Sequence, residues 1–330
     1  MPHESQNRGL QTANRNQKDE FYTQLGDIEK EVCHYRELFR DKTVLCNCDD
    51  PRVSNFFKYF AMNFEHLGLR KLITTCYKSR DMNLFSLNQA EQAISLEYEG
   101  DRNGNHSIDP DEIGIRPLRG DGDFRSPECI ELLRQADIVV TNPPFSLFRE
   151  YLAQLVEHQK KFLIIGNMNA ITYKETFPLL MRNQMWLGCS IHSGDRKFGV
   201  PDDYPLQAAG CGIDEDGQRY IRVKGVRWFT NLDYRQRHEP LVLYKHYTPE
   251  EFPKYDNYDA INVNAYADIP MDYEGVMGVP ITFMDHYCPD QFEIVGLDRY
   301  VQDNPRFGQR FTINGKETYA RILIRKLKQS

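Results

Sequence analysis

Hydrophobic positions follow two different periodicities over the first half of the chain. Residues 43–48 and 137–140 form short apolar runs of the length expected for buried strands. Residues 126–135 and 146–158 repeat their apolar side chains every three to four positions, which is typical of amphipathic helices. Strands alternating with helices predict a parallel sheet covered on both faces. We therefore expect a doubly wound α/β fold with a mostly parallel sheet.

Local signals mark the ends of further elements. Asp50 followed by Pro51 predicts a helix start, and Gly68 predicts where that helix stops. After Trp186 the pattern becomes strand-like or irregular. Further strands are expected at residues 71–77, 94–98, 113–118, 161–166, 226–230 and 319–325, and a further helix at 172–182.

Length and composition bound the organisation of the chain. The 330 residues suit one large domain with insertions or two domains, and 40% hydrophobic residues are enough for a core. We expect a flexible N-terminus at residues 1–18, a core at 19–190, and a region at 191–330 that also holds the remaining core strands. No apolar stretch approaches the roughly 20 residues that span a bilayer. The eight cysteines show no CxxC spacing, which predicts reduced thiols, no metal site and a cytoplasmic protein.

A four-residue motif carries the clearest chemistry. Asn142, Pro143, Pro144 and Phe145 follow a predicted buried strand and precede a predicted helix. An aromatic amino group such as N6 of adenine is a poor nucleophile, and two acceptors for its hydrogens help to localise its lone pair. The Asn side-chain oxygen and a carbonyl of the stiff Pro-Pro turn can supply them, and Phe145 can stack on a flipped base. The alternative is a simple Asn-Pro turn that ends a strand.

The chain resembles the EcoRI-type adenine-specific DNA methyltransferases, or modification methylases, in stretches spread over nearly its whole length. The matching stretches are residues 19–24, 46–51, 54–60, 120–124, 141–149, 254–263 and 275–282. The resemblance implies a Rossmann-like methyltransferase core with a C-terminal addition that reads double-stranded DNA. It also implies methyl transfer from S-adenosyl-L-methionine to N6 of a flipped adenine, and a cognate restriction endonuclease that acts on the same site.

The cofactor site is expected around the ends of the first strands. Asp49 can meet the ammonium or ribose of the cofactor, whereas Asp50 alone reads as a helix N-cap. The strand at 71–77 ends without an acidic residue, so the ribose contact stays open. With the family motifs carried over, the expected cofactor contacts are Tyr22, Thr23, Asn47, Asp49, Asp50, Asp123, Phe124 and Asn142.

A polar loop imitates a calcium site. Acidic and amide side chains between Asp101 and Glu112 fall at the spacing of calcium ligands. However, His106 replaces the glycine needed at the sharp turn, and Pro110 obstructs the helix that should follow. A polar hairpin loop between two strands is the preferred interpretation.

The net charge of −7 excludes a surface that is basic throughout, so DNA contacts must come from local patches. Residues 219–237 carry six cations against one acid, interleaved with aromatic residues. The alternative is a solvated strand face, and a weaker basic segment lies at residues 321–328. The predicted DNA-binding residues are Arg219, Arg222, Lys224, Arg227, Trp228, Arg235 and Arg237.

Two other functions stay open at this point. One is an amino methyltransferase with the same motif that acts on RNA or on a protein glutamine. The other is a catalytically silent DNA-binding protein, which need not bind the cofactor. Methyl-transfer assays on DNA, RNA and protein separate the first, and a thermal shift with the cofactor separates the second.

Overall fold

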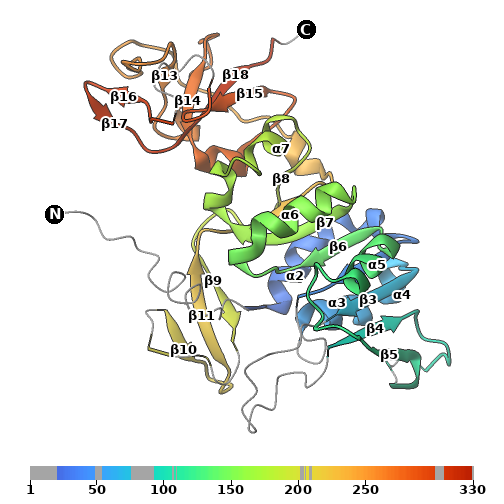
Figure 1. Cartoon of the computed structure of the whole chain (residues 1–330). Helices are drawn as coiled ribbons and strands as arrows, with labels where there is room; N and C mark the ends of the chain where they lie inside the picture. The colour runs from blue at the N-terminus through green and yellow to red at the C-terminus, as the bar shows by residue number, and fades with distance from the viewer. Residues whose placement is uncertain are drawn as a thin grey trace. The chain divides into compact units, whose positions relative to one another are not determined.

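The computed structural model describes residues 21–48, 54–75, 93–105, 108, 110–200, 204, 206–207, 210–301 and 308–328 (Figure 1). The chain divides into two compact units. The first unit holds residues 1–168 and 190–232, and the second holds residues 169–189 and 233–330. The predictions for the flexible N-terminus at 1–18 and for Asp49 and Asp50 lie outside the described residues.

A mixed sheet forms the centre of the first unit. Its strands run in the order β5-β4-β3-β2-β6-β7-β12. The four in the middle are parallel, namely β3 (Lys71–Thr75), β2 (Thr43–Cys46), β6 (Ile138–Thr141) and β7 (Lys161–Asn167). The outer strands are antiparallel to their neighbours, namely β4 (Ile94–Tyr98), β5 (Ile113–Pro117) and β12 (Val226–Thr230). Strands alternating with helices give an α/β structure, as the sequence predicts.

The antiparallel edge was not expected. A parallel neighbour needs a crossover connection, usually a helix, whereas strands joined by a hairpin loop must run antiparallel. In its described residues, the loop between β4 and β5 holds a short 3₁₀ turn at Pro110–Glu112 and no longer helix, and β5 pairs beside β4 as a hairpin.

Five helices are described beside this sheet, and Gly68 ends one of them as the sequence predicts. They are α2 (Leu25–Val32), α3 (Asn55–Met62), α4 (Phe64–Leu67), α5 (Pro127–Gln135) and α6 (Phe148–Glu157), with 3₁₀ turns at Cys33–Phe39 and Phe145–Leu147. Gly68 ends α4 with a left-handed φ of 62°, a conformation that glycine adopts without a steric penalty. Ser126 caps α5 by accepting a hydrogen bond from the Cys129 amide at 3.3 Å.

The described helix begins later than the sequence predicts, and Asp50 and Pro51 themselves lie outside the described residues. Helix α3 begins at Asn55, because the hydroxyl of Ser54 accepts the Phe57 amide at 3.5 Å and the Ser54 backbone is extended. The expected single helix also breaks at Asn63, whose side-chain amide turns back to the Tyr59 carbonyl at 2.8 Å. Capping residues inside the apolar pattern therefore divide what the periodicity joins.

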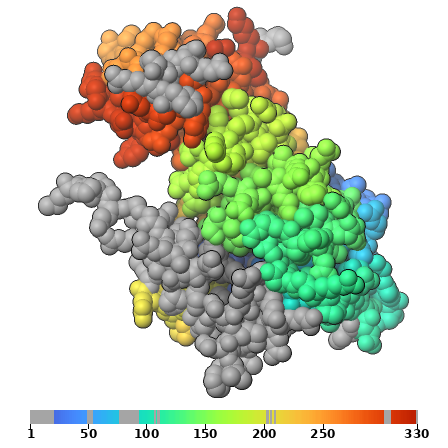
Figure 2. Space-filling model, in the orientation of Figure 1, coloured from blue at the N-terminus to red at the C-terminus, as the bar shows by residue number. Residues whose placement is uncertain are grey.

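A second sheet of the first unit, called here the small sheet, joins the start of the chain to residues after 190. Its order is β1 (Tyr22–Thr23), β9 (Asp195–Gly199), β11 (Arg219–Lys224) and β10 (Cys211–Ile213), all antiparallel. Part of the β10–β11 hairpin, yellow in the space-filling view, lies at the molecular surface (Figure 2).

The second unit is built mainly from short strands. A four-stranded sheet has the order β13 (Ile261–Asn262), β14 (Met277–Pro280), β18 (Arg321–Lys326) and β15 (Phe292–Leu297). Its other elements are α7 (Phe177–Met181), β8 (Trp186–Leu187), β16 (Thr312–Ile313), β17 (Lys316–Glu317) and 3₁₀ turns at Arg235–His238, Tyr266–Asp268 and Ile281–His286. A further 3₁₀ turn at Met168–Thr172 precedes them. The helix expected at 172–182 is only α7, since Pro178 is compatible with the first turn of a helix and not with its interior.

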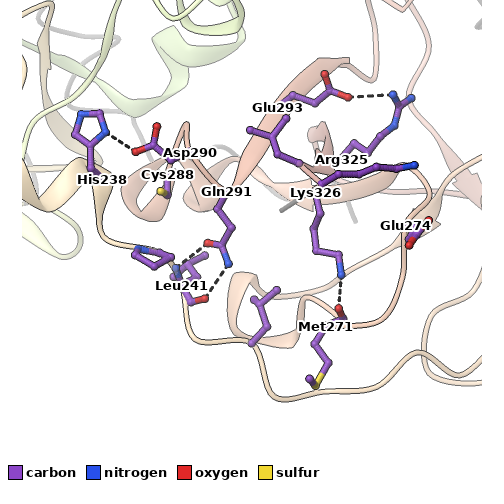
Figure 3. Close-up of a pocket in the computed structure, with 14 residues that line it drawn as sticks. His238, Leu241, Met271, Glu274, Cys288, Asp290, Gln291, Glu293, Arg325 and Lys326 are labelled. Carbon is purple, nitrogen blue, oxygen red and sulfur yellow. Dashed lines mark hydrogen bonds and ion pairs between the residues drawn. The ribbon is translucent and has the colours of Figure 1, made fainter. Parts of the chain in front are cut away.

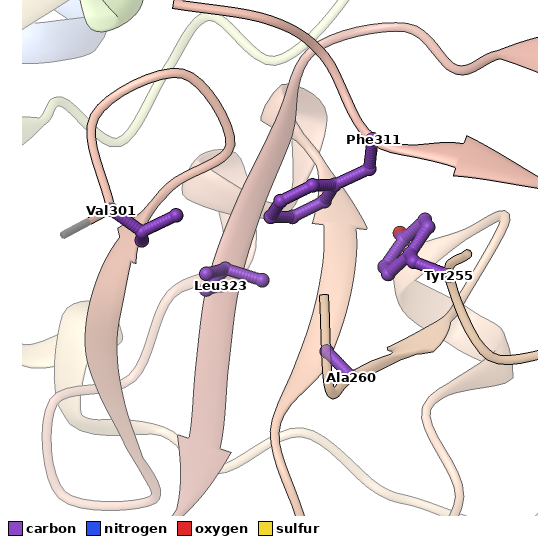
Figure 4. Close-up of a cluster of buried hydrophobic side chains, with 5 residues drawn as sticks. All are labelled: Tyr255, Ala260, Val301, Phe311 and Leu323. Atoms are coloured by element: carbon purple, nitrogen blue, oxygen red, sulfur yellow. The ribbon is translucent and has the colours of Figure 1, made fainter. Parts of the chain in front are cut away.

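The stretches 254–263 and 275–282, which carry part of the family resemblance, pack the core of the second unit. The Tyr255 hydroxyl and the Arg321 Nε both donate to Asn262 Oδ1, at 2.9 and 3.1 Å. Tyr255 also belongs to a cluster of buried hydrophobic side chains (Figure 4), formed with Ala260, Val301, Phe311 and Leu323. In the part of the chain that the structure describes, no helix is both long and apolar enough to cross a bilayer.

Candidate active site

The motif turn leaves the carboxyl end of strand β6. Asn142 and Pro143 are buried, and Pro144 and Phe145 are half-buried. Phe145 opens a 3₁₀ turn that leads into α6, so the strand, turn and helix follow one another as the sequence predicts. Because β2 and β6 are adjacent and parallel, Asn47 at the end of β2 lies at the same edge of the sheet. Open α/β sheets bind ligands at this edge.

The side-chain amide of Asn142 has one satisfied and one unsatisfied end. Its Nδ2 donates to the main-chain carbonyl of Phe21 at 2.6 Å. A carbonyl can only accept, so this bond fixes which end of the amide carries the oxygen. Asn142 Oδ1 is buried and has no hydrogen-bond partner among the described residues. A buried acceptor without a partner costs about 1–3 kcal/mol, and a ligand N–H donor would remove that cost.

Phe145 is supported by an aromatic neighbour. The ring of Phe21 lies edge-on to it, with centroids 5.8 Å apart and planes at 79°. Phe21 is buried, whereas Phe145 is only partly covered. The same residue, Phe21, therefore holds the Asn142 amide through its carbonyl and the Phe145 ring through its side chain.

A buried network connects the two strand ends and helix α6. Thr141 Oγ1 donates to the Asn47 carbonyl, and the Tyr151 hydroxyl donates to Asn47 Oδ1. Burial raises the pKa of the Tyr151 phenol well above its ordinary value, so the hydroxyl keeps its proton. The Tyr151 ring also lies edge-on to Phe124 at 5.0 Å. The structure thus brings Asn47 and Phe124, two predicted cofactor residues, to one helix.

Sequence reasoning included Thr141 in the motif without giving it a role, and it missed Tyr151 and the carbonyl of Phe21. Tyr151 falls on the apolar face of its helix and reads as a core position. A signal was present, since a buried tyrosine normally places its hydroxyl against a hydrogen-bond partner.

Asp123 lies in an ion-paired turn. Its Oδ2 is 2.6 Å from Arg125 Nη2, and its Oδ1 accepts from Arg125 Nε at 2.8 Å. Hydrogen bonds to Asp123 and then to Glu150 raise the pKa of the Arg125 guanidinium above its ordinary range. The turn places the buried Phe124 ring beside Tyr151.

The first strand supplies another buried polar group. Thr23 Oγ1 is buried without a hydrogen-bond partner in the described part of the chain. The Thr23 carbonyl accepts from Asn55 Nδ2 at 2.7 Å, which fastens β1 to the start of α3. Tyr22 is half-buried. With Asn142 Oδ1, the Thr23 hydroxyl gives the region two polar atoms that a polar ligand could satisfy.

Comparison with known proteins decides the family. Residues 9–327 match the family described as adenine-specific methyltransferase EcoRI. The chain belongs to this family. It is 50% identical to the Type II methyltransferase M.EcoRI of Escherichia coli over 98% of both chains. It is 36% identical to M.MgeORF184P of Mycoplasma genitalium, over 95% of this chain and 97% of the relative, and to M.MpnI of Mycoplasma pneumoniae, over 95% and 96%.

These findings confirm the family that the sequence motifs indicate, and the chain is an adenine-specific methyltransferase. No solved structure matches the chain significantly. Within the described residues, no group of three or more His, Cys, Asp and Glu side chains could hold a metal ion.

The residues predicted to bind DNA differ in their exposure to solvent. Arg222 and Lys224 of β11 are exposed. Arg219 of the same strand is half-buried and donates to the Tyr204 carbonyl at 3.2 Å. Arg235 belongs to the second unit and is also exposed.

Three others occupy buried positions. Trp228 is fully buried in β12, and Arg227 donates to the carbonyls of Val226 and His192. Arg237 is buried in the second unit, where its guanidinium lies 3.8 Å above the centre of the Trp186 ring. These three side chains hold the protein itself together, because every position of β12 is enclosed and Arg237 stacks within its own unit.

A groove of about 870 Å³ lies in the second unit (Figure 3). Gln291 bonds both the amide and the carbonyl of Leu241 along one wall, at 2.7 and 2.9 Å. The weaker basic segment at 321–328 lies partly here, with Arg325 paired to Glu293 at 3.0 Å. Arg321 instead is buried against Asn262.

The calcium-like loop directs its polar atoms to its own backbone. Glu112 Oε1 accepts the Arg102 amide at 2.8 Å, and Asp101 Oδ1 accepts the Gly104 amide at 2.6 Å. The strands on either side form the β4–β5 hairpin, as the preferred interpretation predicts. His106 lies outside the described residues.

Proposed function

We propose that the chain methylates N6 of adenine at a specific site in duplex DNA, with S-adenosyl-L-methionine as donor. The observation that carries the proposal is the buried, unpartnered Oδ1 of Asn142 at the carboxyl end of β6. The chain is a site-specific DNA adenine methyltransferase of the EcoRI family. A flipped adenine presents its amino group as the donor that this oxygen lacks.

The residues of the turn prepare the amino group for attack. Asn142 Oδ1 and the Pro143 carbonyl each accept a hydrogen bond from one of the two N6 hydrogens. These bonds localise the nitrogen lone pair away from the ring. Pro144 keeps the turn stiff, and Phe145 stacks on the base. When bound, S-adenosyl-L-methionine supplies a methyl group on a sulfonium, whose C–S bond breaks as the N6–C bond forms, and the surplus N6 proton passes to water.

The cofactor is proposed to lie along the ends of β1, β2 and β6. The Thr23 hydroxyl and the amide of Asn47 are available for its polar groups, with Tyr22 beside them. Phe124 would pack near the adenine of the cofactor. Asp123 would accept a hydrogen bond from the amino group of that adenine while it remains paired with Arg125. Asp49, Asp50 and Asn142 complete the proposed set.

The finer architecture and the partners are proposed with it. A doubly wound methyltransferase core with a C-terminal DNA-reading addition agrees with the four parallel strands at the centre of the first unit. Residues 19–190 are proposed as the core and 191–330 as the recognition region. Exposed Arg222, Lys224 and Arg235 are the proposed phosphate contacts. A restriction endonuclease that cuts the same DNA site is the proposed biological partner, in the cytoplasm.

The test replaces Asn142 by alanine. Transfer of a radiolabelled methyl group to unmethylated plasmid DNA should fall by 10²-fold or more, the size seen when one preorganised hydrogen-bonding group is lost. The N142A protein should still fold, which a cooperative thermal unfolding transition checks. Asn63→Ala is the matched control, because that amide only bonds a carbonyl at a helix end. The proposal would be refuted if N142A methylated DNA nearly as fast as the wild type. It would also be refuted if the wild-type enzyme methylated RNA or protein instead of DNA.

A further inference from the structure

One face of the small sheet gathers basic side chains from two strands. Lys197 of β9 lies directly opposite Arg222 of β11. Alternate residues of a strand share a face, so Tyr220 and Lys224 lie on this side as well, which we call the outer face. Arg222 and Lys224 are exposed, and Lys197 and Tyr220 are half-buried. The opposite face is apolar and carries the buried side chains of Phe198, Ile221 and Val223.

Tyr220 lies between the two opposed cations. Lys197 Nζ is 4.8 Å and Arg222 Cζ 5.8 Å from the centre of its ring, within the range of cation–π attraction. Gly212 is the cross-strand neighbour of Tyr220 on β10. A Cβ at Gly212 would come within 2.8 Å of the Tyr220 hydroxyl, so the ring lies over a position that glycine leaves free. The ring therefore holds both cations at the outer face.

Each of the two opposed cations has a carboxylate partner in the protein. Like charges directly opposite each other on neighbouring strands destabilise a sheet. Asp214 pairs with Lys197 at 2.5 Å, and Asp195 pairs with Arg222 at 3.4 Å. The Arg222 pair is largely exposed, and such pairs contribute about 0–1 kcal/mol. An arriving phosphate can replace a carboxylate in so weak a pair, and Lys224 adds a third positive charge.

The sheet that carries this face extends to the active site. Strand β1 is the edge of the same sheet, with Tyr22 opposite Gly199 and Thr23 opposite Phe198. Phe21, the residue before β1, accepts the hydrogen bond from Asn142. Its ring also packs against Phe198 at 5.9 Å. A nucleic acid on the outer face is thus held by the sheet that orients the catalytic amide.

We propose that Lys197 and Arg222 bind the sugar–phosphate backbone of the DNA substrate, and that Tyr220 positions them. The inference rests on the proposed function and deepens it. Lys197 lies outside the basic run at 219–237, and only the strand register brings it to Arg222. The proposed ligand is DNA because the face presents cations and one tyrosine. DNA-binding proteins contact the phosphates and sugars of DNA with such side chains.

The experiment measures DNA affinity between 50 and 200 mM salt. The slope of log affinity against log salt should become shallower by about 1 in Lys197→Ala and in Arg222→Ala, since each phosphate contact contributes about 0.9 to it. Arg116→Ala is the matched control, an exposed strand arginine paired to Glu97 at 3.6 Å. Its slope should equal that of the wild type. Lys197→Gln keeps the side-chain stem and carries the test if the alanine variant does not fold.

Tyr220 requires a different readout. Tyr220→Phe retains the ring and should bind DNA as the wild type does, whereas Tyr220→Ala should lose affinity. An unchanged salt slope in the Lys197 variants, together with wild-type methylation of the same DNA, overturns this inference and leaves the proposed function intact. Absence of DNA methylation by the wild-type protein overturns the proposed function instead.

Discussion

Replacing Tyr151 by phenylalanine should separate the positioning of the cofactor site from the chemistry. The substitution removes one oxygen from a fully buried side chain and keeps the ring against Phe124. It removes the hydroxyl that donates to Asn47 Oδ1. Among the described residues, the donor that remains near this oxygen is the Cys48 thiol, at 3.7 Å. A buried acceptor that loses its partner costs about 1–3 kcal/mol in the free energy of unfolding. For a unit of this size, each kcal/mol lowers Tm by roughly 2–4 °C.

The functional consequence should appear in cofactor affinity. Without Tyr151 the amide of Asn47 is free to turn, so the Kd for S-adenosyl-L-methionine should rise by about tenfold, which corresponds to about 1.4 kcal/mol. The methylation rate at saturating cofactor should change by less than threefold, because Asn142 and Phe21 keep their contact. Urea denaturation gives the stability, and calorimetric titration gives the Kd.

Tyr35→Phe is the matched control. The Tyr35 hydroxyl is buried in the same unit and donates to Glu31 Oε1 at 2.7 Å, away from the motif turn. It should lose similar stability with unchanged cofactor affinity. If Y151F and Y35F show equal cofactor affinity, the assignment of Asn47 and Tyr151 to the cofactor site fails, whatever the stability results.

Two further outcomes are expected. Gly166→Ala should destabilise the protein by about 1–3 kcal/mol, because the new Cβ would lie 2.5 Å from the buried Phe148 ring at the start of α6; Gly114→Ala, with only ordinary contacts, is its control in thermal unfolding. The pKa of His238 is raised, mainly by its hydrogen bond to Asp290. The contribution of His238 to the free energy of unfolding is therefore complete below about pH 6.5, and it is lost as pH rises through the pKa of the folded state. The stability difference between wild type and His238→Gln should therefore be larger at pH 6 than at pH 9, and an equal difference would contradict this.

The sequence predicts the elements that local signals determine. Strand β12 has the predicted bounds of 226–230, helix α5 lies within the predicted range 126–135, and the Gly68 stop is where the pattern places it. The motif turn at Asn142 also lies between its expected strand and helix. These features depend on neighbouring residues, whose spacing is visible in one sequence.

The remainder depends on pairing between distant segments. No pattern near Tyr22 or Phe198 indicates that they share a sheet, and the register that joins Lys197 to Arg222 is likewise non-local. The basic run shows the opposite limitation, since composition identifies charge but not burial. Trp228 follows Arg227 in that run, and both are buried where β12 pairs with β7 of the central sheet.

Strand β1 has a consequence for how the enzyme is made. Its partner on β9 emerges from the ribosome only after more than half of the protein has been synthesised. A nascent chain that ends before residue 195 contains Asn142 and all four parallel strands but lacks β9, the strand to which β1 pairs. We expect such fragments to form the parallel part of the central sheet without holding Phe21 in place. The methyltransferase would then become active only when the chain after residue 190 has folded back onto its own beginning.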